Sequence, residues 1–152
     1  MNKTKKILLE IISALFTILF LYAATSKLLT HDWFIAQIGS TEMLRPYAKI
    51  LAWLVPLIEI LGAITVWVPP LRLAGLLMCT SLMLIFTVYI FSVLNFSAHV
   101  PCACGGVLQK MSWTTHLYFN IAFLIVGVVG CKIEMDNRRD SSGSKHSMSY
   151  FS

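Results

Sequence analysis

The stretch that decides the fold runs from Ile50 to Leu94 and reads ILAWLVPLIEILGAITVWV, then PP, then LRLAGLLMCTSLMLIFTVYIFSVL. Its two apolar runs, residues 50–68 and 71–94, each have about the 20 residues that a helix needs to cross the hydrocarbon core of a membrane. The two prolines between them end the first helix sharply, because proline has no amide hydrogen to donate. Two long helices joined by so short a turn lie antiparallel, so this stretch predicts a membrane-spanning hairpin.

Two further apolar runs, Ile7–Leu29 and Trp113–Cys131, flank this hairpin. The first follows a basic start and exceeds the apolar core of a secretory signal, about 7–15 residues, so it predicts a retained span. With 57% hydrophobic and 12% charged residues, the 152-residue chain lies outside the range of ordinary soluble domains. The expected fold is therefore all-α: an integral membrane antiparallel four-helix bundle over residues 1–131.

Two segments are too polar to span. Residues from Thr30 to Lys49 mix charged and aromatic side chains, which predicts an interfacial connection with a short amphipathic piece. The segment Lys132–Ser152 is rich in serine and charge, and its apolar content is too low to fold alone. We expect residues 132–152 to form a disordered cytoplasmic tail.

The basic residues predict the orientation of the bundle. Four spans put both termini on one side, and the excess of Lys and Arg marks the cytoplasmic side. Eight of the twelve fall on the terminal side: Lys3, Lys5, Lys6, Arg72, Lys132, Arg138, Arg139 and Lys145. This predicts a multi-pass protein of the cell inner (plasma) membrane with cytoplasmic termini.

The net charge of +5 does not indicate nucleic-acid binding, because the basic residues form no stripe with interleaved aromatics.

The reactive chemistry of the chain is concentrated between the third and fourth spans, where Pro101 precedes Cys102, Ala103 and Cys104. The orientation predicted above places this loop outside the cytoplasm, where disulfides form and persist. A Cys-x-Cys bridge closes a small, strained ring, and strained bridges are reduced more easily than structural ones. The glycines that follow, Gly105 and Gly106, have no Cβ and allow another backbone to approach closely. The pair is a candidate for reversible thiol–disulfide exchange.

Two other interpretations of Cys102 and Cys104 remain open. A structural bridge would remove little chain entropy, because only one residue separates the two cysteines. A metal site could add His99 and His116 to the two thiols, but the spacing does not match common zinc ligands. The other two cysteines, Cys79 and Cys131, lie inside apolar runs and are expected to pack as small hydrophobic residues.

Glu59 is a carboxylate within a predicted span, and such residues mark functional or structural polar sites. At 1.5 Å per residue it lies about 15 Å below the outer surface, and Asn120 lies about 10 Å below the same surface. The two can therefore share one polar centre beneath the cysteine loop. Either they form an interhelical hydrogen bond that holds the bundle together, or they serve proton transfer or a quinone headgroup.

Lys27 and His116 are the other candidates for this polar pocket. Lys27 lies near the outer end of the first span, where a lysine commonly extends its ammonium group to the interface. His116 lies just inside the start of the fourth span, where it can act as a base for a thiol or sit at the interface.

The chain resembles the DoxX-like superfamily of small four-helix membrane proteins and, within it, the methylamine-utilisation MauE family. The resemblance is carried, in chain order, by Ala24–Leu28, Pro56–Gly62, Pro101–Gly106, and Ser112–Trp113 followed by Asn120. It implies a redox-associated role, since that family is linked to disulfide formation in an extracytoplasmic dehydrogenase subunit with a thioredoxin-like partner. Relatives in the superfamily are associated with quinone-linked sulfur oxidation.

Two functions from different classes follow. One is a membrane redox protein whose Cys102 and Cys104 exchange thiol/disulfide equivalents with a thioredoxin-like or client protein, with a quinone as the candidate cofactor. The other is a non-catalytic assembly or scaffold subunit that packs against a larger membrane complex. No resident metal is expected in either.

Overall fold

The computed structural model of the chain describes residues 3–96 and 112–148. These residues form five α-helices and one short 3-10 helix, and no strand occurs among them. The elements are α1 (Lys3–Leu29), α2 (His31–Gly39), η1 (Arg45–Tyr47), α3 (Ala48–Thr65), α4 (Arg72–Phe96) and α5 (Trp113–Met148). Four helical segments are long and apolar enough to cross a membrane: Lys3–Leu29, Arg45–Thr65, Arg72–Asn95 and Thr114–Asp140. The expected all-α, four-helix membrane bundle is confirmed.

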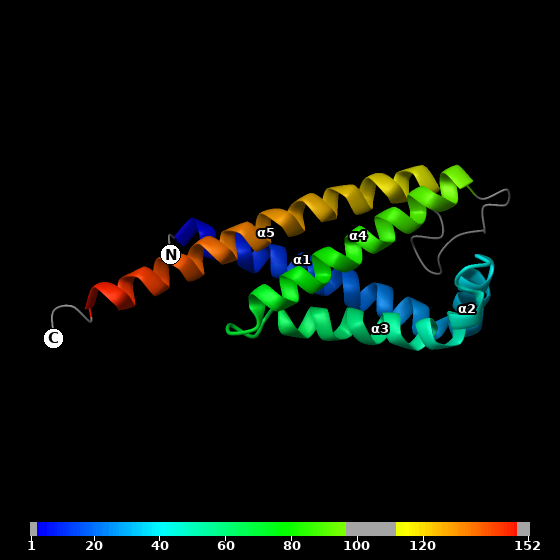
Figure 1. Cartoon of the computed structure of the whole chain (residues 1–152), viewed down its shortest axis with the longest axis horizontal. Coiled ribbons are helices and arrows are strands. Elements are labelled where there is room, and N and C mark those ends of the chain that lie inside the picture. The colour runs from blue at the N-terminus through cyan, green and yellow to red at the C-terminus, as the bar shows by residue number, and fades with distance from the viewer. Residues whose placement is uncertain (1–2, 97–111, 149–152) are drawn as a thin grey trace.

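The four long helices lie side by side and alternate in direction (Figure 1). The pairs α1–α3 and α4–α5 make the largest contacts, and α3–α4 and α1–α5 contacts close the bundle. Short α2 lies across one end and packs on α3, where Ile38, Ala48 and Ala52 form a small apolar cluster. Both termini lie at the opposite end from α2 (Figure 1). The bundle therefore has a terminal end and an α2 end.

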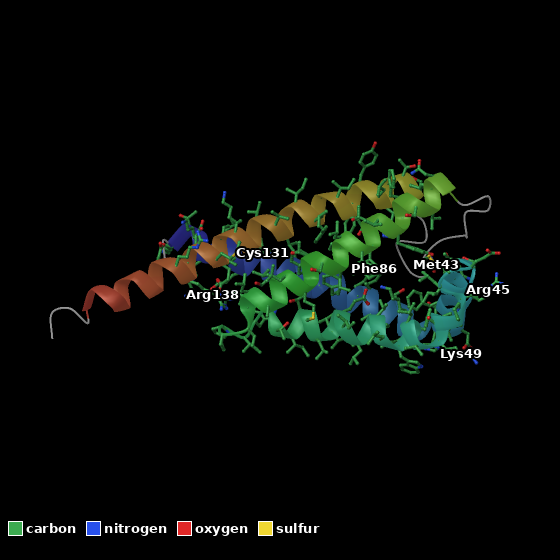
Figure 2. All side chains as sticks on the ribbon, viewed as in Figure 1. Met43, Arg45, Lys49, Phe86, Cys131 and Arg138 are labelled. Atoms are coloured by element: carbon green, nitrogen blue, oxygen red, sulfur yellow. The ribbon has the colours of Figure 1, made fainter. Side chains whose placement is uncertain are left out.

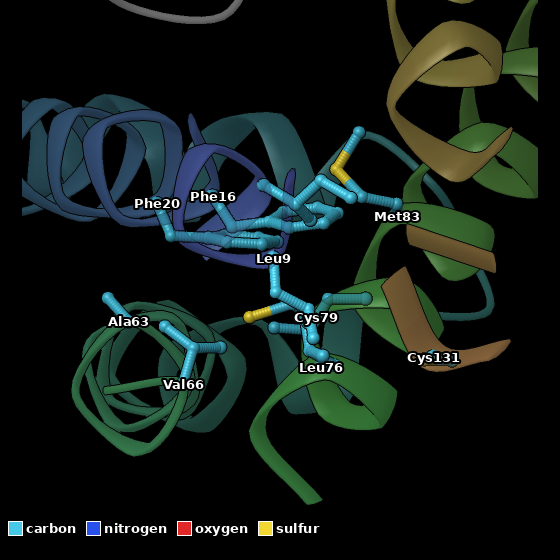
Figure 3. Close-up of a cluster of buried hydrophobic side chains, with 11 residues drawn as sticks. Leu9, Phe16, Phe20, Ala63, Val66, Leu76, Cys79, Met83 and Cys131 are labelled. Carbon is cyan, nitrogen blue, oxygen red and sulfur yellow. The ribbon is translucent and has the colours of Figure 1, made fainter. Parts of the chain in front are cut away.

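Large apolar side chains fill the centre of the bundle (Figure 3). Phe16 and Phe20 of α1 stack with ring centroids 5.9 Å apart, and Phe123 of α5 meets Phe16 edge-on at the same distance. Cys79 and Cys131 belong to the same buried cluster, with exposed fractions of 0% and 6%. Both therefore occupy packing positions, as small hydrophobic residues do.

Close approach of α3 and α4 depends on Gly75. A Cβ on Gly75 would lie only 2.6 Å from the backbone nitrogen of Val66, a distance that no real contact tolerates.

The turn between α3 and α4 begins three residues earlier than the sequence predicts, since α3 ends at Thr65 rather than Val68. A proline disfavours helical geometry at the residue before it, and Val68 is followed by two prolines. The helix therefore ends before Val68.

The segment expected to be a disordered tail differs from the prediction. Helix α5 continues without a break from the span to Met148. Glu134 is buried on this continuation and pairs with Arg138, whose Nε lies 3.1 Å from Oε1 of Glu134. Arg138 also donates to the carbonyl oxygen of Pro70 in the α3–α4 turn. These contacts attach the first turns beyond Cys131 to the bundle. Amino-acid composition alone does not predict them.

Candidate functional site

A buried ion pair joins α1 to α3 at the centre of the site. Nζ of Lys27 lies 2.7 Å from Oε1 of Glu59, and the Glu59 side chain is fully buried while that of Lys27 is 21% exposed. The sequence offers two positions for Lys27, the interface and the polar pocket, and in the structure its ammonium group lies beside Glu59. The lysine turns inward because a carboxylate buried in the bundle needs a nearby positive charge.

Aromatic rings on two other helices enclose the lysine. Nζ of Lys27 lies 5.8 Å from the ring centroid of Phe34 on α2 and 5.3 Å from that of Phe86 on α4. Both distances fall in the range of cation–π attraction, about 6 Å or less. Phe86 lies on the half of α4 nearer the α2 end, whereas Cys131 and Arg138 lie toward the terminal end (Figure 2). The ammonium group is thus held by α1, α2, α3 and α4 together.

These residues line a cavity of about 300 Å³ in the α2 half of the bundle, which we call the Glu59 cavity. Its walls come from all five α-helices and are mostly apolar. Four of the sequence-predicted site residues line it: Lys27, Glu59, His116 and Asn120. Its aromatic lining consists of Phe20, Tyr22, Trp33, Phe34, Phe86, Tyr89 and Phe119. Its volume lies at the lower end of that of small-molecule sites, roughly 300–1,000 Å³.

His116 and Asn120 approach the cavity from α5. They are four residues apart, so they lie on the same face of the helix. Asn120 is 4% exposed, and His116 is partly buried one turn nearer the start of α5. The structure therefore brings the two polar candidates of the fourth span to the same cavity as the Lys27–Glu59 pair.

Two buried polar atoms of the cavity residues have no hydrogen-bond partner among the described residues. They are Oε2 of Glu59 and Nδ2 of Asn120. These two atoms do not bond to each other, and the interhelical hydrogen bond of Glu59 is the one that its Oε1 accepts from Lys27. Buried polar atoms are nearly always paired, so an acceptor and a donor left free at one cavity indicate room for a polar ligand.

A protein-family comparison bears on this arrangement. The family model described as "Methylamine utilisation protein MauE" matches residues 5–133. The chain belongs to the MauE family. No curated protein and no solved structure matches the chain.

The MauE match covers the whole cavity and ends within α5. Every helix that lines the Glu59 cavity contributes its lining residues from within residues 5–133. The part of α5 after Ile133, including the Glu134–Arg138 pair, lies beyond the match. Together with the four spans, membership establishes a multi-pass membrane protein of the MauE family.

The cysteine motif predicted for this MauE protein, Cys102 and Cys104, lies outside the described residues, and so do its neighbours Pro101, Gly105 and Gly106. The helices that the motif connects are described. Helix α4 contributes Ile90 to the cavity and ends at Phe96, and α5 begins at Trp113 and contributes His116. The cavity thus lies at the end of the bundle where the cysteine-bearing segment joins α4 and α5.

The metal interpretation gains no support from the described residues. None of their His, Cys, Asp and Glu side chains form a group of three or more that could hold a metal ion. Of the four ligands considered, His116 is described and lines the cavity, whereas His99, Cys102 and Cys104 lie outside the described residues.

Sequence reasoning missed the pairing of Lys27 with Glu59 and the aromatic enclosure around it. A usable signal was present: Lys27 is the basic residue within the predicted span 7–29, and Glu59 is the acidic residue within the predicted span 50–68. Opposite charges inside a bilayer tend to pair with each other. The aromatic lining had no such signal, because phenylalanine is equally expected at lipid-facing positions.

Proposed function

We propose that this protein exchanges thiol/disulfide equivalents through Cys102 and Cys104 with an extracytoplasmic thioredoxin-like or client protein, and that a quinone in the Glu59 cavity accepts the electrons. The observation that supports this most is the cavity itself. It combines apolar aromatic walls with a buried ion pair and unpaired polar atoms, at the end of the bundle where the cysteine-bearing segment joins. Membership of the MauE family supports a membrane-bound, redox-associated role.

The proposed reaction balances without a further oxidant. The partner's dithiol is oxidised to a disulfide as the Cys102–Cys104 disulfide is reduced to two thiols, through a mixed disulfide between the two proteins. Reoxidation of Cys102 and Cys104 releases two electrons and two protons. A quinone takes up the same two electrons and two protons and becomes a quinol. The client thereby gains a disulfide and the membrane gains a quinol.

The residues of the cavity have separate tasks in this proposal. Lys27 holds the Glu59 carboxylate in place through Oε1. Asn120 offers its amide nitrogen to a ring oxygen. His116, nearer the start of α5, moves protons between the thiols and the cavity. The apolar walls exclude water and accept a hydrophobic tail.

The proposed orientation puts both termini in the cytoplasm and the segment with Cys102 and Cys104 outside it, in the inner membrane of the cell. The bias of Lys and Arg toward the terminal side supports this, since cytoplasmic loops carry the excess of positive charge. An extracytoplasmic position also gives the cysteine pair an oxidising compartment.

Trapping of the mixed disulfide tests the exchange. When the resolving cysteine is replaced, the attacking cysteine stays bound to its partner. We therefore expect either Cys102→Ser or Cys104→Ser to accumulate a reductant-sensitive adduct on non-reducing gels, with a partner that mass spectrometry identifies as a dithiol protein. Cys79→Ser is the matched control, because Cys79 is fully buried in the core and its loss should trap nothing.

Trapping and a second measurement, thiol alkylation, together separate the exchange function from the scaffold function. Absence of an adduct from both single variants would refute the exchange. A Cys102–Cys104 bridge that stays oxidised in membranes treated with a mild dithiol, as read by thiol alkylation, would favour a non-catalytic assembly subunit instead.

A further inference from the structure

The Glu59 cavity presents one hydrogen-bond acceptor and one hydrogen-bond donor that the described protein does not use. Oε1 of Glu59 is occupied by Lys27, which leaves Oε2 of the same carboxylate free. On the facing helix, Nδ2 of Asn120 is free. Both side chains are more than nine-tenths buried, at 0% and 4% exposure. A ligand that satisfies both atoms removes the penalty of leaving them unpaired.

The charges around the cavity select the ligand further. The positive charge of Lys27 is matched by that of Glu59 at 2.7 Å, so the pair is formally neutral. A charged headgroup would find no opposite charge left over and would lose its hydration. The aromatic side chains in the walls, Phe20 and Phe119 among them, suit a flat ring. The ligand that fits is a neutral planar headgroup on an apolar tail.

We propose that Oε2 of Glu59 and Nδ2 of Asn120 are the two binding positions for the headgroup, and that they make the site prefer the quinol over the quinone. This inference rests on the quinone of the proposed function. A quinol hydroxyl donates to Oε2 of Glu59, and a quinol oxygen accepts from Nδ2 of Asn120. A quinone has only acceptors, so it leaves the carboxylate oxygen unpaired.

The same geometry gives Glu59 a task in proton transfer. Oε2 of Glu59 holds one of the two protons that the cysteine pair releases and passes it to the nearer ring oxygen. No atom other than Oε2 is free to do this on that carboxylate, because Oε1 accepts from Lys27. Lys27 is therefore a positioning residue, which fixes the oxygen that faces the headgroup.

Equilibrium binding to purified protein tests this inference without any turnover. The protein is the full chain carrying Cys102→Ser and Cys104→Ser, so that no thiol reacts, and the probes are ubiquinol-1 and ubiquinone-1, followed by calorimetry. We expect this protein to bind the quinol at least tenfold more tightly than the quinone. Adding Glu59→Gln should reduce the ratio to within twofold, because the amide can donate to a quinone carbonyl.

Two further variants make the test specific. Asn120→Leu removes the donor that both ligands use, and we expect at least tenfold weaker binding of each. Glu134→Gln is the matched control, because Glu134 is also a buried acid with an unpaired Oε2 but lies at the terminal end of the bundle. It should leave both affinities unchanged.

The outcomes distinguish this inference from the function on which it rests. Binding of neither ligand would refute the quinone and this inference together, and trapping of the cysteine adduct would then stand alone. Equal binding of both ligands, or a quinol preference that survives Glu59→Gln, would refute only the inference. If Glu59→Gln does not fold, unchanged affinities in Asn120→Leu would refute it.

Discussion

Lys27 and Glu59 illustrate how the membrane turns two residues into one feature. Each charge alone is costly within a span, and together they form a 2.7 Å ion pair that joins α1 to α3. The two residues are not equivalent, since the lysine is 21% exposed and the glutamate is fully buried. The lysine can reach the interface if its partner is lost, whereas the glutamate cannot.

Replacing Lys27 should therefore lower the free energy of unfolding more than replacing Glu59. Lys27→Met leaves a buried carboxylate without a countercharge, and we expect it to lower the free energy of unfolding by about 3–5 kcal/mol. Glu59→Gln should cost less, because the freed lysine can extend to the surface. The double variant should recover most of the loss seen in Lys27→Met. Denaturant titration in detergent, followed by circular dichroism, measures all three, and a Lys27→Met variant as stable as the wild type would contradict the ion pair.

At the scale of elements, sequence patterns give the spans closely and their ends less well. Three of the expected spans correspond to α1, α3 and α4, because apolar runs of this length have few alternatives in a membrane. The pattern fails beyond Cys131, where polar composition predicts disorder and the structure has helix. There, one i,i+4 pair and a contact with the Pro70 carbonyl hold the chain. Such contacts depend on which turn lies beside the helix, and a single sequence does not give that neighbour.

The junction of α3 and α4 gives a prediction about packing. Gly75→Ala would place a methyl group 2.6 Å from the backbone nitrogen of Val66, so the two helices must separate. We expect a loss of about 1–3 kcal/mol, the usual cost of overpacking, despite the better helix propensity of alanine. Gly39→Ala is the control, since its Cβ would make an ordinary contact of 4.0 Å with Ala48. Equal unfolding midpoints for the two variants would show that the junction is not tightly packed.

At the scale of the whole molecule, the two ends of the bundle differ in chemistry. The α2 end holds the Glu59 cavity and the helix ends that lead to the cysteine motif, while the terminal end holds the Glu134–Arg138 pair. That Glu59 and Asn120 lie near one polar centre could be predicted from residue counts, because a helix rises evenly along its axis, and both line the Glu59 cavity. The inward turn of Lys27 and the free atoms at the cavity could not, since they depend on how side chains meet across four helices.

The proposed orientation of these two ends predicts a labelling pattern in whole cells. In a background with Cys79→Ser, Cys131→Ser and Cys104→Ser, the remaining Cys102 should react with a membrane-impermeant maleimide without lysis, because eight of twelve basic residues assign the other end to the cytoplasm. A Ser152→Cys variant lacking the four native cysteines is the matched control and should react only after the membrane is opened. The reverse pattern would place Cys102 in the reducing cytoplasm, where a strained bridge would not persist. The cavity would then open toward the wrong compartment for an extracytoplasmic client, and the exchange with such a client would be refuted even if quinol binding held.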